Sequence, residues 1–277
     1  MIPKAYITHW SNRAPWPTES QIEQDLILSR LIVEIANHDM LGAELALRGG
    51  TCLHKLHLAA PLRYSEDLDY VRRTEGGVAP IMAAIREVAT GAGLVENGYE
   101  QNFQMVHMVF DAEPTSGVGR IRVKVETDIR ETDSFAPRET LPYQVDSPWW
   151  AGAADVPTFS IEELMGTKFR ALYQRRKGRD VFDLWLALTR LDVDVERIMG
   201  AFSHYIGDNI FGFSALARNL KDKLANREFL VDLDQLLVEI PDGYVIDTAT
   251  DLVVERLGVL LKGAPALADI EGGAWRR

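Results

Sequence analysis

The segment from Leu47 to Val71 constrains the fold of this chain more than any other stretch, and it reads LRGGTCLHKLHLAAPLRYSEDLDYV. A strand expected over 41–48 ends at Gly49 and Gly50, and Thr51 then opens a short helix. Glycine lets the backbone approach a ligand closely, while a helix N-terminus presents free N–H groups and a dipole that favour phosphate. This order of elements predicts a phosphate-binding turn at the glycines, to which the hydroxyl of Thr51 adds a donor.

Two aspartates follow on the next expected strand, which runs over 65–73. Side chains alternate between the faces of a strand, so Asp67 and Asp69 share one face with Ser65, while Leu68 points into the core. Neighbouring carboxylates repel each other unless a cation lies between them, and Mg²⁺ commonly bridges carboxylates to substrate phosphates. We therefore expect Asp67 and Asp69 to bind Mg²⁺, or else Mn²⁺. The competing interpretation is a solvated strand face after an ordinary turn.

A third carboxylate is expected on the strand IRVKVETDI, which covers 121–129. Its apolar residues alternate with Arg122, Lys124, Glu126 and Asp128, so the strand has one buried and one polar face. Two-metal sites place carboxylates around both metal ions, and a neighbouring strand is expected to supply one more. We choose Glu126 for this position, with Asp128 as its substitute. The alternative is that the polar face of the strand is only exposed to solvent.

Basic residues concentrate between Lys168 and Arg179, where six of twelve residues are Lys or Arg. The whole chain carries a net charge of −11, which argues against a protein that coats nucleic acid nonspecifically. A local basic cluster beside a metal–carboxylate site suits a triphosphate or a phosphate backbone. The alternative is a solvent-exposed charged helix, in which Asp180 and Asp183 form local salt bridges or cap the next helix.

The chain is expected to divide into a core over 1–145, which includes an N-terminal helix, and a helical domain over 146–277. Residues 131–158 contain four prolines and no clear period, so we interpret them as a linker between the domains. Strand patterns dominate before this stretch and helical patterns from Ser160 onward, which indicates the α+β class.

Composition indicates a protein of the reducing cytoplasm with no membrane association. No run of 18 apolar residues is present, as a membrane-spanning helix would require. The N-terminus lacks the apolar region of a signal peptide. A single cysteine, Cys52, cannot form an internal disulfide and fits a reducing compartment.

The motifs, in this order, resemble those of the AbiEii/AbiGii-type nucleotidyltransferase toxins of type IV toxin–antitoxin systems, within the DNA polymerase β-like superfamily. The resemblance spans roughly residues 20–190. The residues that carry it are Gly49-Gly50-Thr51, Arg63-Tyr64-Ser65-Glu66-Asp67-Leu68-Asp69, Glu163-Leu164 with Lys168, Ala171-Leu172 and Arg176, and Arg179-Asp180 with Asp183-Leu184.

The resemblance implies a polymerase β-like core with a mixed sheet, followed by a helical C-terminal domain that carries the second catalytic motif. It implies that Asp67, Asp69, Lys168 and Asp183 are catalytic, and that Lys168 contacts the triphosphate. The residues expected to bind the nucleotide are Gly49, Gly50, Thr51, Arg63, Ser65, Lys168, Arg176 and Arg179.

The resemblance also implies a function: transfer of a nucleoside monophosphate, in similar toxins a pyrimidine nucleotide, from a triphosphate to the 3′ end of tRNA, which blocks translation. A cognate antitoxin is the expected partner, and phosphorylation of Ser65 or Thr51 is one way in which it would neutralise the toxin. Two alternatives remain from the residues. The acceptor is a protein or a small molecule such as an antibiotic, or the fold is a catalytically inactive binding module.

Overall fold

The computed structural model describes residues 2–276, which form two compact units. Unit 1 extends to Phe159 and includes the short segment Leu236–Val238, whereas unit 2 comprises Ser160–Gln235 and the residues from Glu239 onward. No helix among the described residues is long and apolar enough to cross a membrane. Each unit is described by itself below.

Unit 1 is built on one mixed sheet of seven strands, in the order β3-β4-β5-β2-β1-β7-β6. Most neighbouring strands are antiparallel, but β2 pairs with β5 and β1 pairs with β7 in parallel. The strands are β1 Leu45–Arg48, β2 Asp67–Arg72, β3 Val95–Gln101, β4 Met105–Ala112, β5 Ile121–Asp128, β6 Glu139–Asp146 and β7 Ala151–Thr158. The parallel pairing places β2 and β5, both rich in acidic residues, side by side in the middle of the sheet.

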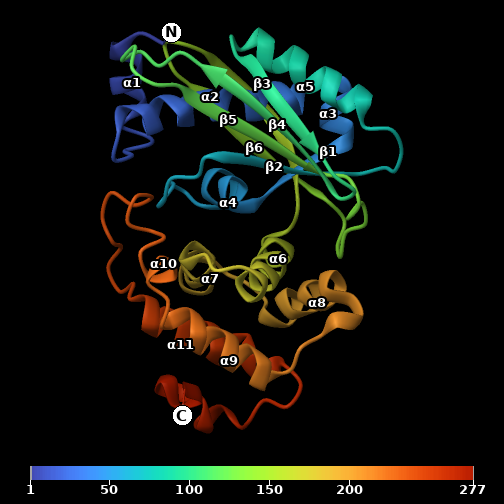
Figure 1. The fold of residues 1–277 in the computed structure, drawn as a ribbon, viewed down its shortest axis with the longest axis vertical. Helices are drawn as coiled ribbons and strands as arrows, with labels where there is room; N and C mark the ends of the chain where they lie inside the picture. The colour runs from blue at the N-terminus through green and yellow to red at the C-terminus, as the bar shows by residue number, and fades with distance from the viewer. Residues whose placement is uncertain (1, 277) are drawn as a thin grey trace. The chain divides into compact units, whose positions relative to one another are not determined.

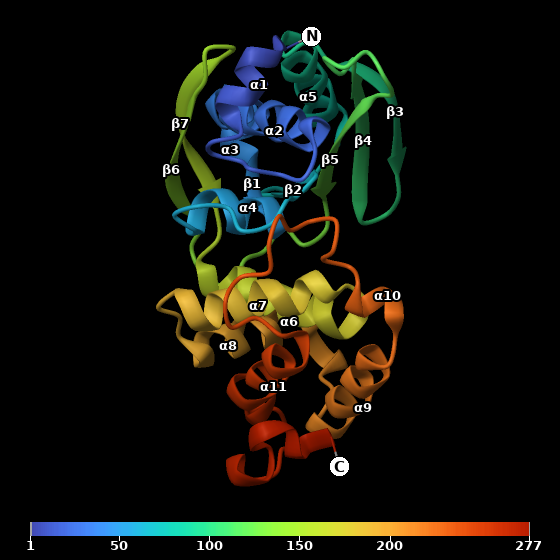
Figure 2. The same cartoon turned by 90° about the vertical axis from the view of Figure 1, so that its left-hand side faces the viewer.

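The helices of unit 1 bury one face of this sheet. The long helix α2 packs against β7, β5 and β6, and Figure 2 shows it lying between strands β3–β5 and strands β6–β7. Its Leu26, Leu28 and Ile32 are fully buried, as are Met108 and Val123 of the sheet. The helices are α1 Lys4–Trp10, α2 Glu19–Asn37, α3 Asp39–Glu44, α4 Gly49–Cys52 with the π-helical turn Leu53–His57, and α5 Ala79–Gly91.

Unit 2 is helical (Figure 1). Helix α6 packs against α7 and α8, and α7 packs against α11, around the buried rings of Phe169, Phe182 and Phe202. The helices are α6 Ile161–Gln174, α7 Gly178–Arg190, α8 Val195–Ile206, α9 Phe213–Leu224, α10 Arg227–Leu230 and α11 Ile246–Arg256, with 3₁₀ turns at Gly207–Asn209, Gly258–Leu260, Leu267–Asp269 and Glu271–Arg276.

The expected α+β class is confirmed, and most expected elements agree with the structure to within a few residues. Three expectations are wrong. Residues 131–158 are not a linker, because β6 and β7 lie there. The strand expected over 41–48 begins only at Leu45, because α3 precedes it. A boundary at 145/146 would therefore cut between two paired strands, whereas the compact units divide after Phe159.

Candidate active site

The turn after β1 lies against the acidic strand β2. Gly49 has a φ of +81°, a left-handed conformation that favours glycine. A Cβ added to Gly49 would lie 2.2 Å from Oδ2 of Asp69, and one added to Gly50 would lie 2.2 Å from Nη2 of Arg63 and 3.1 Å from Oγ of Ser65. Both glycines are therefore required for the close approach of the turn to the polar side chains that follow it.

Thr51 ties this turn to the start of β2. Its side chain is fully buried, and its hydroxyl donates to the main-chain oxygen of Asp67 at 2.6 Å. A further hydrogen bond joins it to Oγ of Ser65 at 2.9 Å. Because the hydroxyl of Thr51 is already engaged, its role in this structure is to hold the turn against the carboxylates, while its backbone remains part of the turn.

Cys52, the next residue, is structural. Burial raises the pKa of its thiol to about 12, despite a hydrogen bond with the hydroxyl of Thr158 at 3.0 Å. A thiol of this kind is protonated at neutral pH, and the thiolate is the nucleophilic form. Nucleophilic chemistry at Cys52 is therefore excluded.

Arg63 is also buried beside the turn, with 1% of its surface exposed. Its guanidinium lies against Gly50 and donates to the carbonyl oxygen of Tyr64 at 3.0 Å. Tyr64 in turn donates its backbone N–H to Leu236, within unit 1. The loop before β2 is thereby fixed, and a permanent positive charge lies next to the expected phosphate-binding turn.

The carboxylates of β2 and β5 come together through the parallel register of these strands. Asp69 is the register partner of Glu126, and Asp67 is the partner of Lys124. Leu68, between the aspartates, is fully buried, whereas both aspartates are half-buried. The strand alternation therefore agrees with the expectation, and three carboxylates occupy one face of adjacent strands.

The carboxylates of this cluster concentrate negative charge, and the pKa values of Asp67 and Glu126 are shifted by their surroundings. The pKa of Asp67 is raised to about 7, mainly by burial and then by repulsion from Asp69, while the positive charge of Lys124 opposes the rise. Burial alone would also raise the pKa of Glu126, but its hydrogen bond and ion pair with Lys124, and the nearby His107, hold that pKa below its usual value. The Nδ1 atom of His107 lies 3.3 Å from Oε1 of Glu126.

Glu126 rather than Asp128 is available as the third carboxylate. Asp128 is buried and bound to Arg48, whose Nη2 lies 3.0 Å from Oδ2. Its other oxygen accepts the backbone N–H groups of Arg130 and Glu131 at 2.9 and 3.0 Å. Every strong acceptor position of Asp128 is thus occupied by the protein itself.

The donor chemistry of Asp67, Asp69 and Glu126 suits Mg²⁺, which prefers carboxylate oxygens and keeps positions open for substrate phosphates and water. The raised pKa of Asp67 reports negative charge that the protein leaves partly unneutralised. Within the described residues, no three acidic, His or Cys side chains converge tightly enough to enclose a metal ion on their own. The residues therefore fit a metal shared with a substrate better than a closed structural site.

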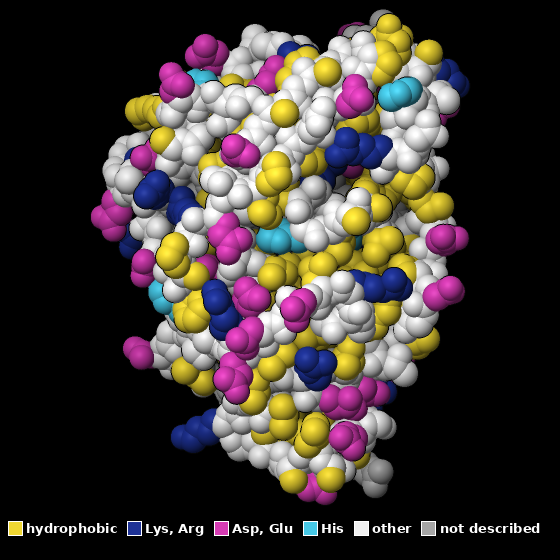
Figure 3. Space-filling view, turned by 180° about the vertical axis from the view of Figure 1, so that it is seen from behind, with side chains coloured by type: hydrophobic (Ala, Val, Ile, Leu, Met, Phe, Trp, Pro, Cys, Tyr) yellow, Lys and Arg dark blue, Asp and Glu magenta, His cyan; other side chains and the backbone are white. Residues whose placement is uncertain are grey.

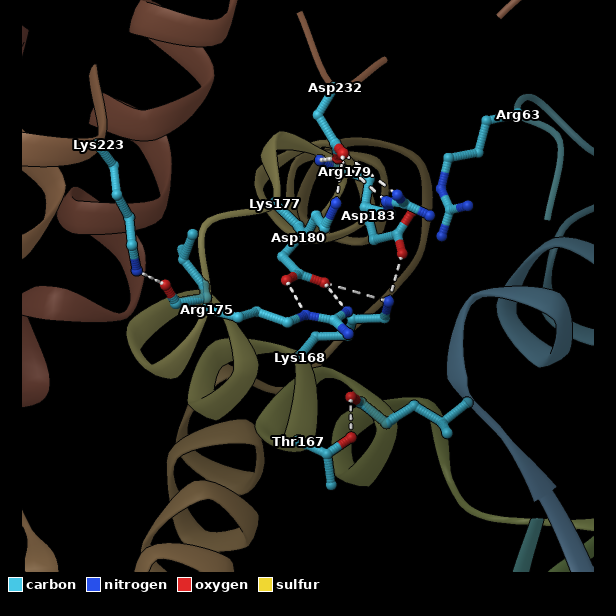
Figure 4. A network of polar contacts seen from close by, with 12 residues as sticks. Arg63, Thr167, Lys168, Arg175, Lys177, Arg179, Asp180, Asp183, Lys223 and Asp232 are labelled. Atoms are coloured by element: carbon cyan, nitrogen blue, oxygen red, sulfur yellow. Dashed lines mark hydrogen bonds and ion pairs between the residues drawn. The ribbon is translucent and has the colours of Figure 1, made fainter. Parts of the chain in front are cut away.

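In unit 2, the second predicted motif forms a buried ionic network (Figure 4). Nζ of Lys168, on α6, lies 2.8 Å from Oδ2 of Asp183 and 3.4 Å from Oδ1 of Asp180, both on α7. Both aspartates are fully buried and Lys168 is 6% exposed. Arg175 binds Asp180 through two hydrogen bonds of 2.7 Å. The structure thus joins Lys168 and Asp183, which sequence reasoning had selected separately.

The remaining basic residues divide between internal ion pairs and the surface. Arg179 binds Asp232 through its guanidinium at 3.0 and 3.2 Å, and although burial raises the pKa of Asp232, these hydrogen bonds lower it below its usual value. The ammonium of Lys223 donates to the backbone carbonyls of Leu172 and Tyr173 at the end of α6. Arg176 is exposed and makes no ion pair within the described part of the chain.

The structure therefore supports in part the alternative interpretation of this basic cluster, in which Asp180 and Asp183 form local salt bridges. Lys168, Arg175 and Arg179 each face an aspartate, and α6 ends at Gln174 rather than continuing through the cluster. On the molecular face shown in Figure 3, Lys and Arg side chains likewise lie scattered among Asp and Glu. Arg176 is the member of the cluster whose charge stays directed to solvent.

Sequence reasoning named Lys124 as a polar-face residue and Asp180 as a salt-bridge candidate, but it missed His107 and Asp232. Lys124 and His107 flank Glu126, while Asp180 and Asp232 neutralise the basic residues of unit 2. Strand alternation already placed Lys124 on the polar face of β5. No sequence signal placed His107 beside Glu126, because the register between β4 and β5 depends on the intervening turn.

A mixed sheet with a glycine turn against Asp69, followed by a helical unit, is the arrangement expected of a nucleotidyltransferase. The family described as "Nucleotidyl transferase AbiEii toxin, Type IV TA system" matches residues 30–255. The chain belongs to this family, and is therefore a nucleotidyltransferase toxin of a type IV toxin–antitoxin system.

Solved structures support the fold. MenT4, the nucleotidyltransferase toxin Rv2826c from Mycobacterium tuberculosis H37Rv, superimposes with a TM-score of 0.65 and 16% identity, covering 100% of this chain and 94% of MenT4. JHP933 from Helicobacter pylori gives a TM-score of 0.51 with 20% identity over 87% of this chain and 90% of that one. A putative nucleotidyltransferase from H. pylori gives the same score and identity, covering 87% and 93%. No curated protein matches the sequence.

Proposed function

We propose that this toxin transfers a nucleoside monophosphate from a nucleoside triphosphate, with a pyrimidine favoured, to the 3′ hydroxyl of tRNA. Pyrophosphate is released and the modified tRNA no longer supports translation. The observation that carries the proposal is the contact of the Gly49 turn with Asp69, whose register partner is Glu126. This contact supports the proposal of one site in unit 1 that combines a phosphate-binding turn with three carboxylates.

The residues of unit 1 divide the work of binding and orientation. Backbone N–H groups at Gly49, Gly50 and Thr51 bind the phosphates, and Arg63 adds charge beside them. When bound by Asp67, Asp69 and Glu126, Mg²⁺ lowers the pKa of the attacking hydroxyl and neutralises the leaving pyrophosphate.

Within unit 2, the family resemblance implies that Lys168 and Arg176 bind phosphate through their positive charge, and Arg179 holds the start of α7 through Asp232. Asp183 orients Lys168 through their buried ion pair. Electrostatic stabilisation of a transferring phosphoryl group by fixed cations is a large part of such catalysis. Because the chain is acidic overall, binding of tRNA rests on local contacts and is sensitive to salt.

Neutralisation by the cognate antitoxin is proposed to act on Ser65 rather than Thr51. Both hydroxyls lie in the site, but Thr51 is fully buried and Ser65 is half-exposed. A phosphate on Ser65 would place about two negative charges beside Asp67 and Gly50, where substrate phosphates bind. Mass spectrometry of the chain co-expressed with its antitoxin tests this: a phosphate on Ser65 supports it, and an unmodified but neutralised toxin contradicts it.

Label transfer tests the proposed function itself. Each of the four α-³²P nucleoside triphosphates is incubated with total tRNA, Mg²⁺ and either the wild type or Asp69→Ala. We expect label on tRNA from a pyrimidine triphosphate with the wild type and none with the variant. Label that appears instead on a protein band or a small molecule in cell lysate would replace tRNA as the acceptor.

Thermal stabilisation separates an active enzyme from an inert binding fold. A ligand that binds the native state raises its apparent stability, so Mg²⁺ with a triphosphate should raise the melting temperature of the wild type. Asp67→Asn should weaken or abolish the Mg²⁺-dependent part of this shift. Equal shifts in both proteins, without label transfer, would identify a binding module.

A further inference from the structure

A groove of about 520 Å³ runs over β3, β4 and β5 in unit 1. Its floor contains Gly98 and Val109, which are register partners, and its wall contains Arg122 and Lys124 of β5. A Cβ added to Gly98 would meet no atom within 4 Å, so the space above the floor is open. His107 closes the groove toward the carboxylates.

The groove and the carboxylates share one face of the sheet. Residues directly opposite each other on paired strands point to the same face. Asp67 pairs with Lys124, which pairs with Val109 and through it with Gly98, in one row across four strands. Three strand spacings separate the ends of this row, about 14 Å.

A second row runs parallel to the first. Asp69 pairs with Glu126, Glu126 with His107, and His107 with Glu100. The groove therefore begins at the β5 side of the three carboxylates. The glycine turn lies at the other side of β2, because it follows β1.

This placement assigns different sides of the carboxylates to the two substrates. Nucleotidyl transfer needs the attacking hydroxyl and the leaving pyrophosphate roughly in line on opposite sides of the reacting phosphorus. If the turn at Gly49 holds the triphosphate on the β1 side, the acceptor approaches from the β5 side. The groove is the hollow that the sheet offers there.

The chemistry of the groove suits single-stranded nucleic acid. Arg122 has 68% of its side chain exposed and lies no closer than 3.8 Å to Asp111, so its charge is directed to solvent. Lys124 lies between the groove and Glu126. The small residue Gly98 and the apolar Val109 leave room for a flat ring, and cations along one side can meet phosphates, as in the basic grooves that follow a single-stranded backbone. Glu100 is the carboxylate on the opposite wall.

We propose that this groove binds the single-stranded 3′ end of the RNA acceptor, with Arg122 and Lys124 on its phosphates and a base over Gly98 and Val109, so that the terminal hydroxyl reaches Glu126. The proposal rests on the proposed function and names the surface that positions its second substrate. Arg122 is a positioning residue for the acceptor and does not touch the triphosphate.

Arg120 provides a matched control for Arg122. Both are exposed arginines at the start of β5, and Asp111 lies 3.0 Å from Arg120 and 3.8 Å from Arg122. Arg120 lines a separate hollow with Arg30 and Trp149. Removing either side chain changes the net charge equally. A difference in RNA affinity between the two variants therefore reflects contact with the groove rather than the overall charge.

The binding experiment uses the full chain without triphosphate, so that no reaction occurs, and a short RNA oligonucleotide with a 5′ fluorophore and a free 3′ hydroxyl. We expect Arg122→Ala to weaken binding about 5- to 10-fold, Arg122→Glu to weaken it further, and Arg120→Ala to change it less than about twofold. The slope of log Kd against log salt should fall by about 0.7 in Arg122→Ala, as for one lost phosphate contact on a single strand. Melting temperatures of all variants check their folding.

Steady-state kinetics supply the second readout. Arg122→Ala and Arg122→Glu should raise the KM for RNA and leave the KM for the triphosphate unchanged. The groove proposal is overturned if Arg122→Glu binds and labels RNA as the wild type does, if Arg120→Ala weakens binding as much as Arg122→Ala, or if the oligonucleotide does not bind the wild type. Failure of the proposed function is read separately, as label that the wild type places on a polypeptide or small molecule and not on RNA.

Discussion

Asp69 and Glu126 are register partners on the adjacent parallel strands β2 and β5. The relationship brings a third carboxylate beside two that are already crowded, and it depends on the pairing of strands that are separated in the chain by a helix and a hairpin. Lys124 and His107 contact Glu126 from within unit 1. These contacts offset part of the clustered negative charge of the carboxylates.

The raised pKa of Asp67 predicts a pH-dependent cost to stability. A carboxyl group with a pKa of about 7 in the folded state and about 4 in the unfolded state is protonated in both states at low pH. As pH rises from about 4 to about 7 the unfolded state ionises first, so folding stability falls, and the full cost persists above pH 7.

Asp67→Asn should therefore stabilise the metal-free protein more at pH 8 than at pH 5. Allowing for the partial exposure of Asp67, we expect roughly 2 kcal/mol at pH 8, or an increase of about 4–8 °C in melting temperature. Thermal denaturation in EDTA at both pH values measures it. Asp111→Asn, which removes a carboxylate bound to Arg120, is the control and should not stabilise; an equal gain for Asp67→Asn at the two pH values would contradict the electrostatic explanation.

Gly49→Ala should reduce both stability and nucleotidyl transfer. The substitution forces a side chain into a left-handed backbone conformation and against Oδ2 of Asp69. Strain of this kind costs about 1–3 kcal/mol, and displacement of Asp69 should lower kcat by about 100-fold. Urea denaturation and label transfer measure the two effects.

Gly93→Ala is the control for backbone strain. Gly93 has a φ of +84°, but a Cβ there would meet nothing within 4 Å. Its substitution should cost a similar conformational strain and leave transfer close to the wild-type rate. A comparable loss of activity in both variants would show that the contact between Gly49 and Asp69 is unimportant.

Lys168→Met should destabilise the protein by about 3 kcal/mol, because it leaves buried Asp183 without the ammonium at 2.8 Å. The double variant Lys168→Met/Asp183→Leu replaces the ion pair with apolar groups and should recover most of that stability. Denaturation and label transfer are compared across the single and double variants.

The double variant should remain inactive if Lys168 contacts the triphosphate, since its charge is then needed in the reaction. Recovery of transfer together with stability would instead limit Lys168 and Asp183 to a structural role in unit 2. The two readouts therefore separate catalysis from folding.

The local part of the site was accessible from the sequence. Gly49, Gly50 and the alternation of Asp67 and Asp69 about Leu68 depend on neighbouring residues, so periodicity and turn chemistry predicted their arrangement. The choice between Glu126 and Asp128 required the register of β2 with β5 and the ion pair of Asp128 with Arg48. Both depend on long-range pairing, which strand alternation does not specify.

Two other features lay beyond sequence reasoning for related reasons. Pro142 suggested a linker, but β6 is an edge strand, where proline is tolerated because one side of the strand has no partner to bond.

The sequence did not indicate the partner of Arg179 in the basic cluster from Lys168 to Arg179, because Asp232 follows more than fifty residues after Arg179. Tertiary packing brings that carboxylate to Arg179 at 3.0 Å.

The most direct test of the catalytic carboxylates compares Glu126→Gln with Asp128→Asn, two isosteric changes two residues apart on β5. Label transfer from the preferred triphosphate is measured for both, with melting temperatures as the check on folding. Glu126→Gln should lower the transfer rate by about 100-fold or more, since it removes the proposed metal ligand beside Asp69. Asp128→Asn, whose carboxylate is bound to Arg48, should retain transfer to within about tenfold, with a lower melting temperature. Full activity in folded Glu126→Gln, with loss in folded Asp128→Asn, would contradict the assignment of Glu126 to the active site.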